Sequence, residues 1–234
     1  MGMKKFVFTL AIVCCFFVLA LLPAQADTLT LTSCHISSGC PAPGTAFGTI
    51  TLTQSGTDVT VDVVLTSGNR FVETGSGGDM LVAFNDSLTG STITNMTATL
   101  DGADITSTIS GGLTGVTNQN PFMADGTGTF TAGVSCSTFA SCNGGSAPDM
   151  NDLHFTVTNA TVAGLETANA NGNLFIADIL FGAQGGTGTG PVDISVPVTS
   201  TPESPSLALF GTGLFSIAGM LRRKMRKYPN AARL

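Results

Sequence analysis

Residues 48–66 read GTITLTQSGTDVTVDVVLT, and this stretch decides the predicted fold. Aliphatic residues alternate with threonine or aspartate in both of its halves, at Ile50 and Leu52 and again at Val59, Val61 and Val63. A period of two places alternate side chains on opposite faces of a strand, so each half predicts a β-strand with one buried and one solvent-facing side. Between the halves, residues 54–58 have turn chemistry, and the stretch therefore predicts a β-hairpin.

Similar short runs recur between clusters of Gly, Asn, Asp and Ser. They predict further strands at Leu29–Thr32, Phe71–Thr74, Met80–Phe84, Ile93–Leu100, Gly128–Val134, Leu153–Val157, Asn173–Phe181 and Val192–Val198. Residues 27–201 also hold 32 threonines, whose branched Cβ favours strands over helices. The sequence predicts an all-β domain built as a β-sandwich, with a jelly-roll-like topology as one form of it. The alternative is partial disorder of this Thr- and Gly-rich chain, foremost at Gly185–Gly190.

Charged residues divide the 234-residue chain into three parts. Eight of its nine lysines and arginines lie within the first five or the last thirteen residues. Between Asp27 and Thr201 there are 14 acidic residues and one basic residue, Arg70, which gives that segment a net charge of −13. An interior this acidic repels phosphate backbones, so a nucleic-acid-binding role is excluded.

The first 26 residues have the three-part pattern of a secretory signal peptide. Met1–Lys5 carries two lysines, and Phe6–Leu22 is an uncharged, mostly apolar run. Ala24 and Ala26 then supply the small residues that signal peptidase needs, so residues 1–26 predict a signal peptide that is cleaved after Ala26. The apolar run is slightly longer than usual, which leaves an uncleaved anchor as the alternative.

The C-terminal segment combines a proline-bearing hinge, an apolar run and a basic cluster. Residues 201–205 read TPESP, Ser206–Leu221 carries no charge, and 222–227 read RRKMRK. At 1.5 Å per residue, a helix over 206–221 spans about 24 Å, against a hydrocarbon core of roughly 30 Å. The pattern predicts a transmembrane helix at 206–221, with 222–227 and the tail 228–234 in the cytoplasm. One interpretation is a permanent type I membrane anchor.

The same segment, over residues 201–227, resembles the PEP-CTERM sorting signal, which exosortases recognise in bacteria that make extracellular polysaccharide. Pro202 and Glu203 match the first two positions of the family pattern. Ser204 stands where the family has its second proline, and a proline follows at Pro205.

An apolar run rich in Leu, Gly and Ala comes next, and the basic end of the pattern is matched by Arg222, Arg223 and Lys224. The resemblance implies that an exosortase cleaves the chain near Pro202-Glu203. Parts of the interior also resemble a recurrent group of PEP-CTERM ectodomains, at Gly48–Gln54, Leu153–Val157 and Asn171–Ile179. That second resemblance implies a coherent domain and brings no activity with it.

Four cysteines lie in the predicted mature domain, in two pairs of equal spacing, Cys34 with Cys40 and Cys136 with Cys142. An even number of cysteines in an exported protein indicates disulfides. Local pairing is the first choice because a small loop closes at little entropic cost. The alternative is a zinc site with His35 and His154 as added ligands.

Motifs of enzymatic chemistry are scarce. A Ser/His/acid hydrolase needs a nucleophile held against a base, and a structural role is the simpler interpretation for the two histidines, His35 and His154. No lysine lies between Asp27 and Thr201, which excludes Schiff-base chemistry there. The Gly-rich residues 185–190 lack the Lys-Ser/Thr ending of a phosphate loop. We predict no enzymatic activity and no cofactor.

The sequence leaves two binding roles as alternatives, calcium binding and sugar binding. Loop acids that offer hard oxygen ligands for calcium occur at Asp101, Asp104, Asp149 and Asp152, and solvated turn residues are the simpler interpretation. Sugar-binding faces generally stack their ligand on Trp or Tyr, and residues 27–200 contain neither. This disfavours a lectin without excluding it.

Together these features predict an exported, non-enzymatic protein of the cell surface or extracellular matrix. Its all-β domain at 27–200 lies outside the cytoplasm, first as an inner-membrane-anchored precursor. The expected partners are signal peptidase, an exosortase, the membrane and extracellular polysaccharide. The alternatives are a calcium- or polysaccharide-binding module on a permanent C-terminal anchor, and a secreted hydrolase.

Overall fold

The hairpin predicted at residues 48–66 is present as the strands β3 (Gly48–Ser55) and β4 (Asp58–Leu65), which pair antiparallel over their full lengths. Gly56 in the connecting turn has a φ of 62°, a conformation that glycine adopts without steric cost. The aliphatic positions of both strands are buried, and most of the threonines and aspartates between them are partly exposed. The hairpin prediction is confirmed.

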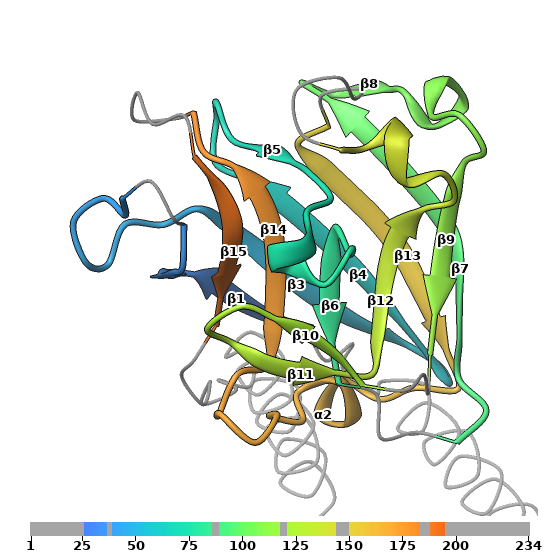
Figure 1. Cartoon of the computed structure of the whole chain (residues 1–234). Helices are drawn as coiled ribbons and strands as arrows, with labels where there is room; N and C mark the ends of the chain where they lie inside the picture. Colours follow the sequence, from blue (N-terminus) through green and yellow to red (C-terminus); the bar gives the residue numbers. More distant parts are fainter. Residues whose placement is uncertain are drawn as a thin grey trace, which may run out of the picture. The chain divides into compact units, whose positions relative to one another are not determined.

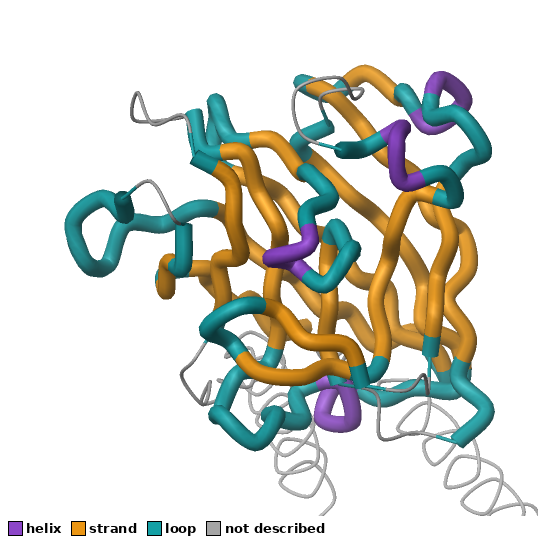
Figure 2. Tube along the Cα trace, in the orientation of Figure 1, coloured by secondary structure: helices purple, strands orange, loops and turns teal. Residues whose placement is uncertain are grey.

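The computed structural model describes residues 26–36, 39–85, 89–117, 121–143, 150–182 and 188–194. These residues form antiparallel strands with almost no helix, which confirms the all-β prediction (Figures 1 and 2). The other strands are β1 (Ala26–Leu31), β2 (Ser33–Cys34), β5 (Arg70–Phe71), β6 (Val82–Phe84), β7 (Thr92–Leu100), β8 (Ala103–Asp104), β9 (Leu113–Val116), β10 (Phe122–Ala124), β11 (Gly128–Phe130), β12 (Ala132–Cys136), β13 (Asp152–Thr158), β14 (Phe175–Leu180) and β15 (Thr189–Asp193). The helical turns are η1 (Gly75–Gly77), η2 (Thr106–Thr108), η3 (Phe139–Ser141) and α2 (Val162–Leu165).

Two antiparallel sheets contain most of the strands. One has the order β1-β3-β4-β13-β7-β8, and the other has the order β2-β15-β14-β6-β12-β9, with β5 paired to β14. The sheets share one core, in which the ring of Phe84 on β6 stacks on Phe155 of β13 at 6.0 Å and on Phe175 of β14 at 5.3 Å. The arrangement is therefore sandwich-like (Figure 1).

The hairpin β10–β11 forms a separate two-stranded sheet that covers part of the second sheet. Its residues Ala124 and Phe130 pack with Ala83 of β6 and Ile176 of β14 in a small second core. In Figure 1 this hairpin crosses in front of β14 and β6. Because both faces of β14 are covered, five of its six residues are buried, and its sequence is nearly all apolar instead of alternating.

The single strand predicted at Gly128–Val134 is wrong. The chain instead forms β11, which pairs only with β10, and then β12, which pairs with β6 and β9. The break falls at Thr131, where the chain leaves the covering hairpin and enters the large sheet. Two other predicted strands lie at shifted positions. The strand predicted at Phe71–Thr74 corresponds to β5, which ends at Phe71, before η1. The strand predicted at Val192–Val198 corresponds to β15, which begins at Thr189.

A β-bulge interrupts β7. The register against β13 shifts between His154 and Thr156, so that Asn95 and Met96 together lie opposite a single residue of β13. Asn95, within the bulge, has a φ of 53°, a left-handed conformation that asparagine adopts more readily than most residues. The shift explains why Ile93 and Ala98 are both buried although five positions separate them.

The described body begins at Ala26 and ends at Ile194, within the domain predicted at 27–200 apart from its first residue. The predicted signal peptide up to Gln25 and the predicted sorting segment at 201–227 lie outside the described residues. Among the residues that are described, no helix is long and apolar enough to cross a membrane.

Candidate functional site

Both cysteine pairs form local disulfides, Cys34 with Cys40 and Cys136 with Cys142, each across a sequence separation of 6. This is the pairing expected from the sequence. Glu73 holds the second loop at both ends, because its backbone N–H donates to Cys142 O at 2.8 Å and its carboxylate accepts from the Cys136 N–H. With their sulfurs bonded to each other, these cysteines offer no thiolate to zinc.

Glu73 also belongs to a buried acid pair with Asp178 of β14; the two residues are 1% and 0% exposed. Asp178 Oδ2 accepts hydrogen bonds from Thr74 N at 2.7 Å and from Thr74 Oγ1 at 2.6 Å. Its other oxygen, Oδ1, has no hydrogen-bond partner among the described residues. The hydrogen bonds thus compensate only part of the cost of burying this carboxyl group.

Burial raises the pKa of Glu73 and the pKa of Asp178 to about 7 each. Hydrogen bonds from Cys136 and Thr74 act in the opposite direction, and the charge of Asp79 raises both pKa values further. Each group therefore changes its protonation near neutral pH. The sequence contains one signal of this pair, which is an aspartate inside the apolar run Leu174–Phe181.

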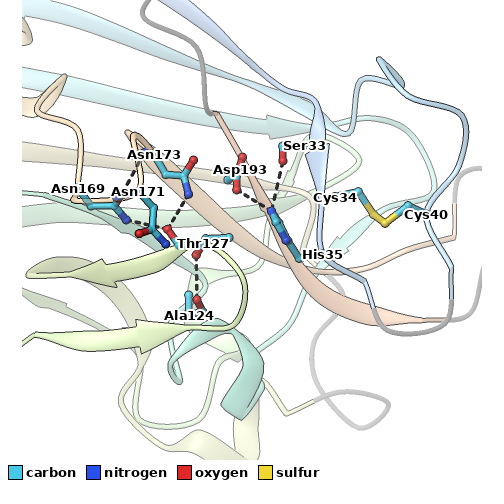
Figure 3. Close-up of polar contacts among 10 residues, drawn as sticks. All are labelled: Ser33, Cys34, His35, Cys40, Ala124, Thr127, Asn169, Asn171, Asn173 and Asp193. Atoms are coloured by element: carbon cyan, nitrogen blue, oxygen red, sulfur yellow. Dashed lines mark hydrogen bonds and ion pairs between the residues drawn. A yellow bond between two sulfur atoms is a disulfide. The ribbon is translucent and has the colours of Figure 1, made fainter.

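A second polar group, the His35 cluster, consists of Ser33, His35 and Asp193 (Figure 3). His35 Nε2 lies 2.9 Å from Asp193 Oδ2 and 3.3 Å from Ser33 Oγ. In a catalytic triad the carboxylate and the hydroxyl contact different ring nitrogens, whereas here both contact Nε2. This geometry does not support a proton relay. The contact of His35 with Asp193 instead connects the end of β2, next to the Cys34–Cys40 disulfide, to the end of β15.

The turn of the hairpin β10–β11 lies between His35 and an asparagine-rich loop (Figure 3). A Cβ atom on Gly126 would lie 2.5 Å from His35 Nδ1, so only glycine fits there. On the other side, Thr127 O accepts hydrogen bonds from Asn169 Nδ2 at 2.8 Å and Asn173 Nδ2 at 2.6 Å. These contacts hold the covering hairpin on the body.

The second histidine, His154, lies on β13 beside Asp62 of β4, and its Nδ1 contacts an oxygen of that carboxylate. Both side chains are more than 40% exposed, at 44% and 43%. His35 sits instead at β2, in the other sheet. The two histidines considered as zinc ligands are therefore on different sheets.

Three of the acidic residues considered for calcium lie in the described residues, and each contacts a donor of the protein. Asp101 Oδ1 accepts from Asn151 Nδ2 at 2.9 Å, and Asp101 Oδ2 lies 3.6 Å from Arg70 Nη2. The two other described candidates accept hydrogen bonds from threonine, Asp104 from Thr106 N and Asp152 from Thr99 Oγ1, each at 2.8 Å.

Asp149 lies outside the described residues. Within the part of the chain that the structure describes, no three His, Cys, Asp or Glu side chains are grouped to hold a metal ion. Calcium binding stays an alternative, and solvated turn residues remain the simpler interpretation.

The chain matches no protein-family model, no curated protein and no solved structure. Of the targeting residues, only Ala26 is described, as the first residue of β1. Ala24 and the sorting-motif residues lie outside the described ranges, namely Pro202, Glu203, Ser204, Pro205, Arg222, Arg223 and Lys224. A proposal about function must therefore combine the sequence pattern of the ends with the structure of the body.

Proposed function

We propose that this chain is an exported, non-enzymatic protein of the cell surface or extracellular matrix. In this proposal, signal peptidase cleaves after Ala26, and an exosortase recognises residues 201–227 and cleaves near Pro202-Glu203. The observation that carries the proposal is the sequence pattern of the two ends. A signal-peptide pattern at 1–26 and a sorting-signal pattern at 201–227 flank the all-β body that the structure describes.

The two disulfides support export. Structural disulfides form and persist in oxidising compartments and are rare in the cytosol, where thiols are kept reduced. Both bonds lie in the described body, and each closes a small loop, Cys34–Cys40 beside β2 and Cys136–Cys142 after β12. Cross-links of this size stabilise a fold by about 2 kcal/mol each in the chain-entropy account.

The attachment of β15, the last strand among the described residues, is compatible with a tail that is processed as a separate segment. β15 pairs with β14 on one side and with β2 on the other, and Asp193 at its end contacts His35. Both edges of β15 are therefore paired within the described body. Prolines at 197, 202 and 205 disfavour helix and ladder hydrogen bonds in the linker and motif, which suits a protease substrate.

For the body itself, the jelly-roll-like form of the β-sandwich stays a prediction. The two facing sheets of similar size support a sandwich. We find no contact in the described residues that favours a hydrolase or a calcium-binding module over a passive surface protein.

The proposal is tested by fractionating a bacterium that carries an exosortase and the same strain without it. With the enzyme, we expect a shortened protein released from the inner membrane; without it, a longer precursor should accumulate in the membrane. The double variant Pro202→Ala/Glu203→Gln should behave as if the enzyme were missing. Pro229→Ala, outside the motif, is the matched control and should be released normally. Membrane retention of the full-length tail in both strains would favour the permanent anchor instead.

A further inference from the structure

Asp27, the residue after the proposed cleavage site, occupies a core position. In β1 the buried residues are Asp27, Leu29 and Leu31, and the threonines between them are exposed. Asp27 is only 5% exposed, and its Oδ2 atom has no hydrogen-bond partner among the described residues. An ionised carboxylate in such a place is costly unless a cation or several donors face it.

A second carboxyl group with the same deficit lies close by. Glu166 follows α2, and its Oε1 atom is buried without a hydrogen-bond partner in the described part of the chain. The pKa of Glu166 is raised, first by burial and then by the charge of Asp27, so Asp27 lies near enough to act on it. A positive group near both carboxyl groups would offset the cost of burying their orphaned oxygens.

No side chain of the described body supplies that positive group. The single basic residue between Asp27 and Thr201 is Arg70, which lies 3.6 Å from Asp101. His35 contacts Asp193, and His154 contacts Asp62. Export itself, however, creates a cation at this place.

We infer that the α-ammonium group produced by cleavage after Ala26 is bound by the carboxylates of Asp27 and Glu166, so that maturation locks β1 into the fold. Signal peptidase consumes one water: the Ala26–Asp27 bond breaks, Ala26 keeps a carboxylate, and the Asp27 nitrogen leaves as an amine that takes up a proton. An α-amino group has a pKa of about 8 and is mostly charged at neutral pH. The inference rests on the proposed cleavage after Ala26.

The test moves the ammonium group away from the two acids. The exported protein is compared with a variant that carries Gly-Ser inserted between Ala26 and Asp27, which leaves the signal peptide and its alanines unchanged. We expect the insertion to lower the melting temperature by about 4 °C. In the background Asp27→Asn/Glu166→Gln, where no carboxylate remains to bind the cation, the same insertion should shift melting by less than about 1 °C.

The intact mass of each purified protein shows where its chain begins, and so distinguishes a failure of the proposed cleavage from a failure of the ammonium site. If the exported wild-type chain does not begin at Asp27, the proposed cleavage fails and the inference fails with it. If it begins at Asp27 and the insertion lowers the melting temperature equally in both backgrounds, or in neither, the cleavage stands and the ammonium site is wrong.

Discussion

The free energy of unfolding of the exported protein should fall by several kcal/mol as the pH rises from about 4 to about 7. The pKa values of Glu73 and Asp178 are raised from 4.5 and 3.8 to about 7 by burial in the folded protein. Below about pH 3 both groups are protonated in the folded and unfolded states, so they cost nothing. Between pH 4 and 7 mainly the unfolded chain releases these protons, which favours unfolding by about 3 kcal/mol for Glu73 and about 4 kcal/mol for Asp178. Above about pH 8 both groups are ionised in both states, and the loss of stability is complete.

Asp178→Asn should remove much of this slope. The amide oxygen of asparagine can still accept the hydrogen bonds from Thr74, and the variant has no charge to bury. We expect the variant to be similar to the wild type at pH 4 and more stable than it at pH 8, by about 4 kcal/mol. Urea unfolding at a series of pH values measures both quantities.

The exposed Asp125 provides the matched control, and Asp125→Asn should keep the wild-type slope. A wild-type protein whose stability rises steadily from pH 4 to 8 would contradict the assignment of the buried acid pair. So would an Asp178→Asn variant with an unchanged slope.

Phe84→Ala is expected to reduce the free energy of unfolding by about 4 kcal/mol, because it opens a cavity where the two sheets meet. Phe84 is fully buried, and its ring contacts Phe155 of the opposite sheet as well as Phe175 of its own. The matched control is Phe139→Ala in η3, since Phe139 is 43% exposed and its loss should cost less than about 1 kcal/mol. Equal losses for the two variants in urea unfolding would mean that the sheets do not pack through Phe84.

The strands that could be predicted from sequence are those with one buried and one solvent-facing side. β3, β4 and β13 lie in the sheet whose outer side is open, so their alternation is regular and their positions were correct within about one residue. β10 and β11 could not be predicted because each has only three residues, too few for an alternating pattern to show, and the place of their hairpin over the second sheet depends on contacts with β6 and β14. The β7 bulge likewise depends on its pairing with β13, which local sequence does not reveal.

The polar clusters also divide into those that local sequence predicts and those that depend on long-range strand pairing. The disulfides follow from spacing within six residues, which is a local property. The contact of His35 with Asp193 joins residues separated by 158 positions, and only the pairing of β2 with β15 brings them together. Glu73 and Asp178 are also brought into one region by long-range pairing, since β5 pairs with β14 and Val72 N donates to Asp178 O, although the lone aspartate in an apolar strand was a usable signal. The ends of the chain carry local motifs, and for that reason they support the functional proposal.

Mass spectrometry of the protein recovered from outside the cytoplasm tests the central claim most directly, under conditions that preserve disulfides. The account predicts a chain that begins at Asp27, ends near Pro202 and is four mass units lighter than its reduced form, two for each disulfide. Recovery from the cytosol of an unprocessed chain, Met1 to Leu234, with all of its thiols reduced would contradict it.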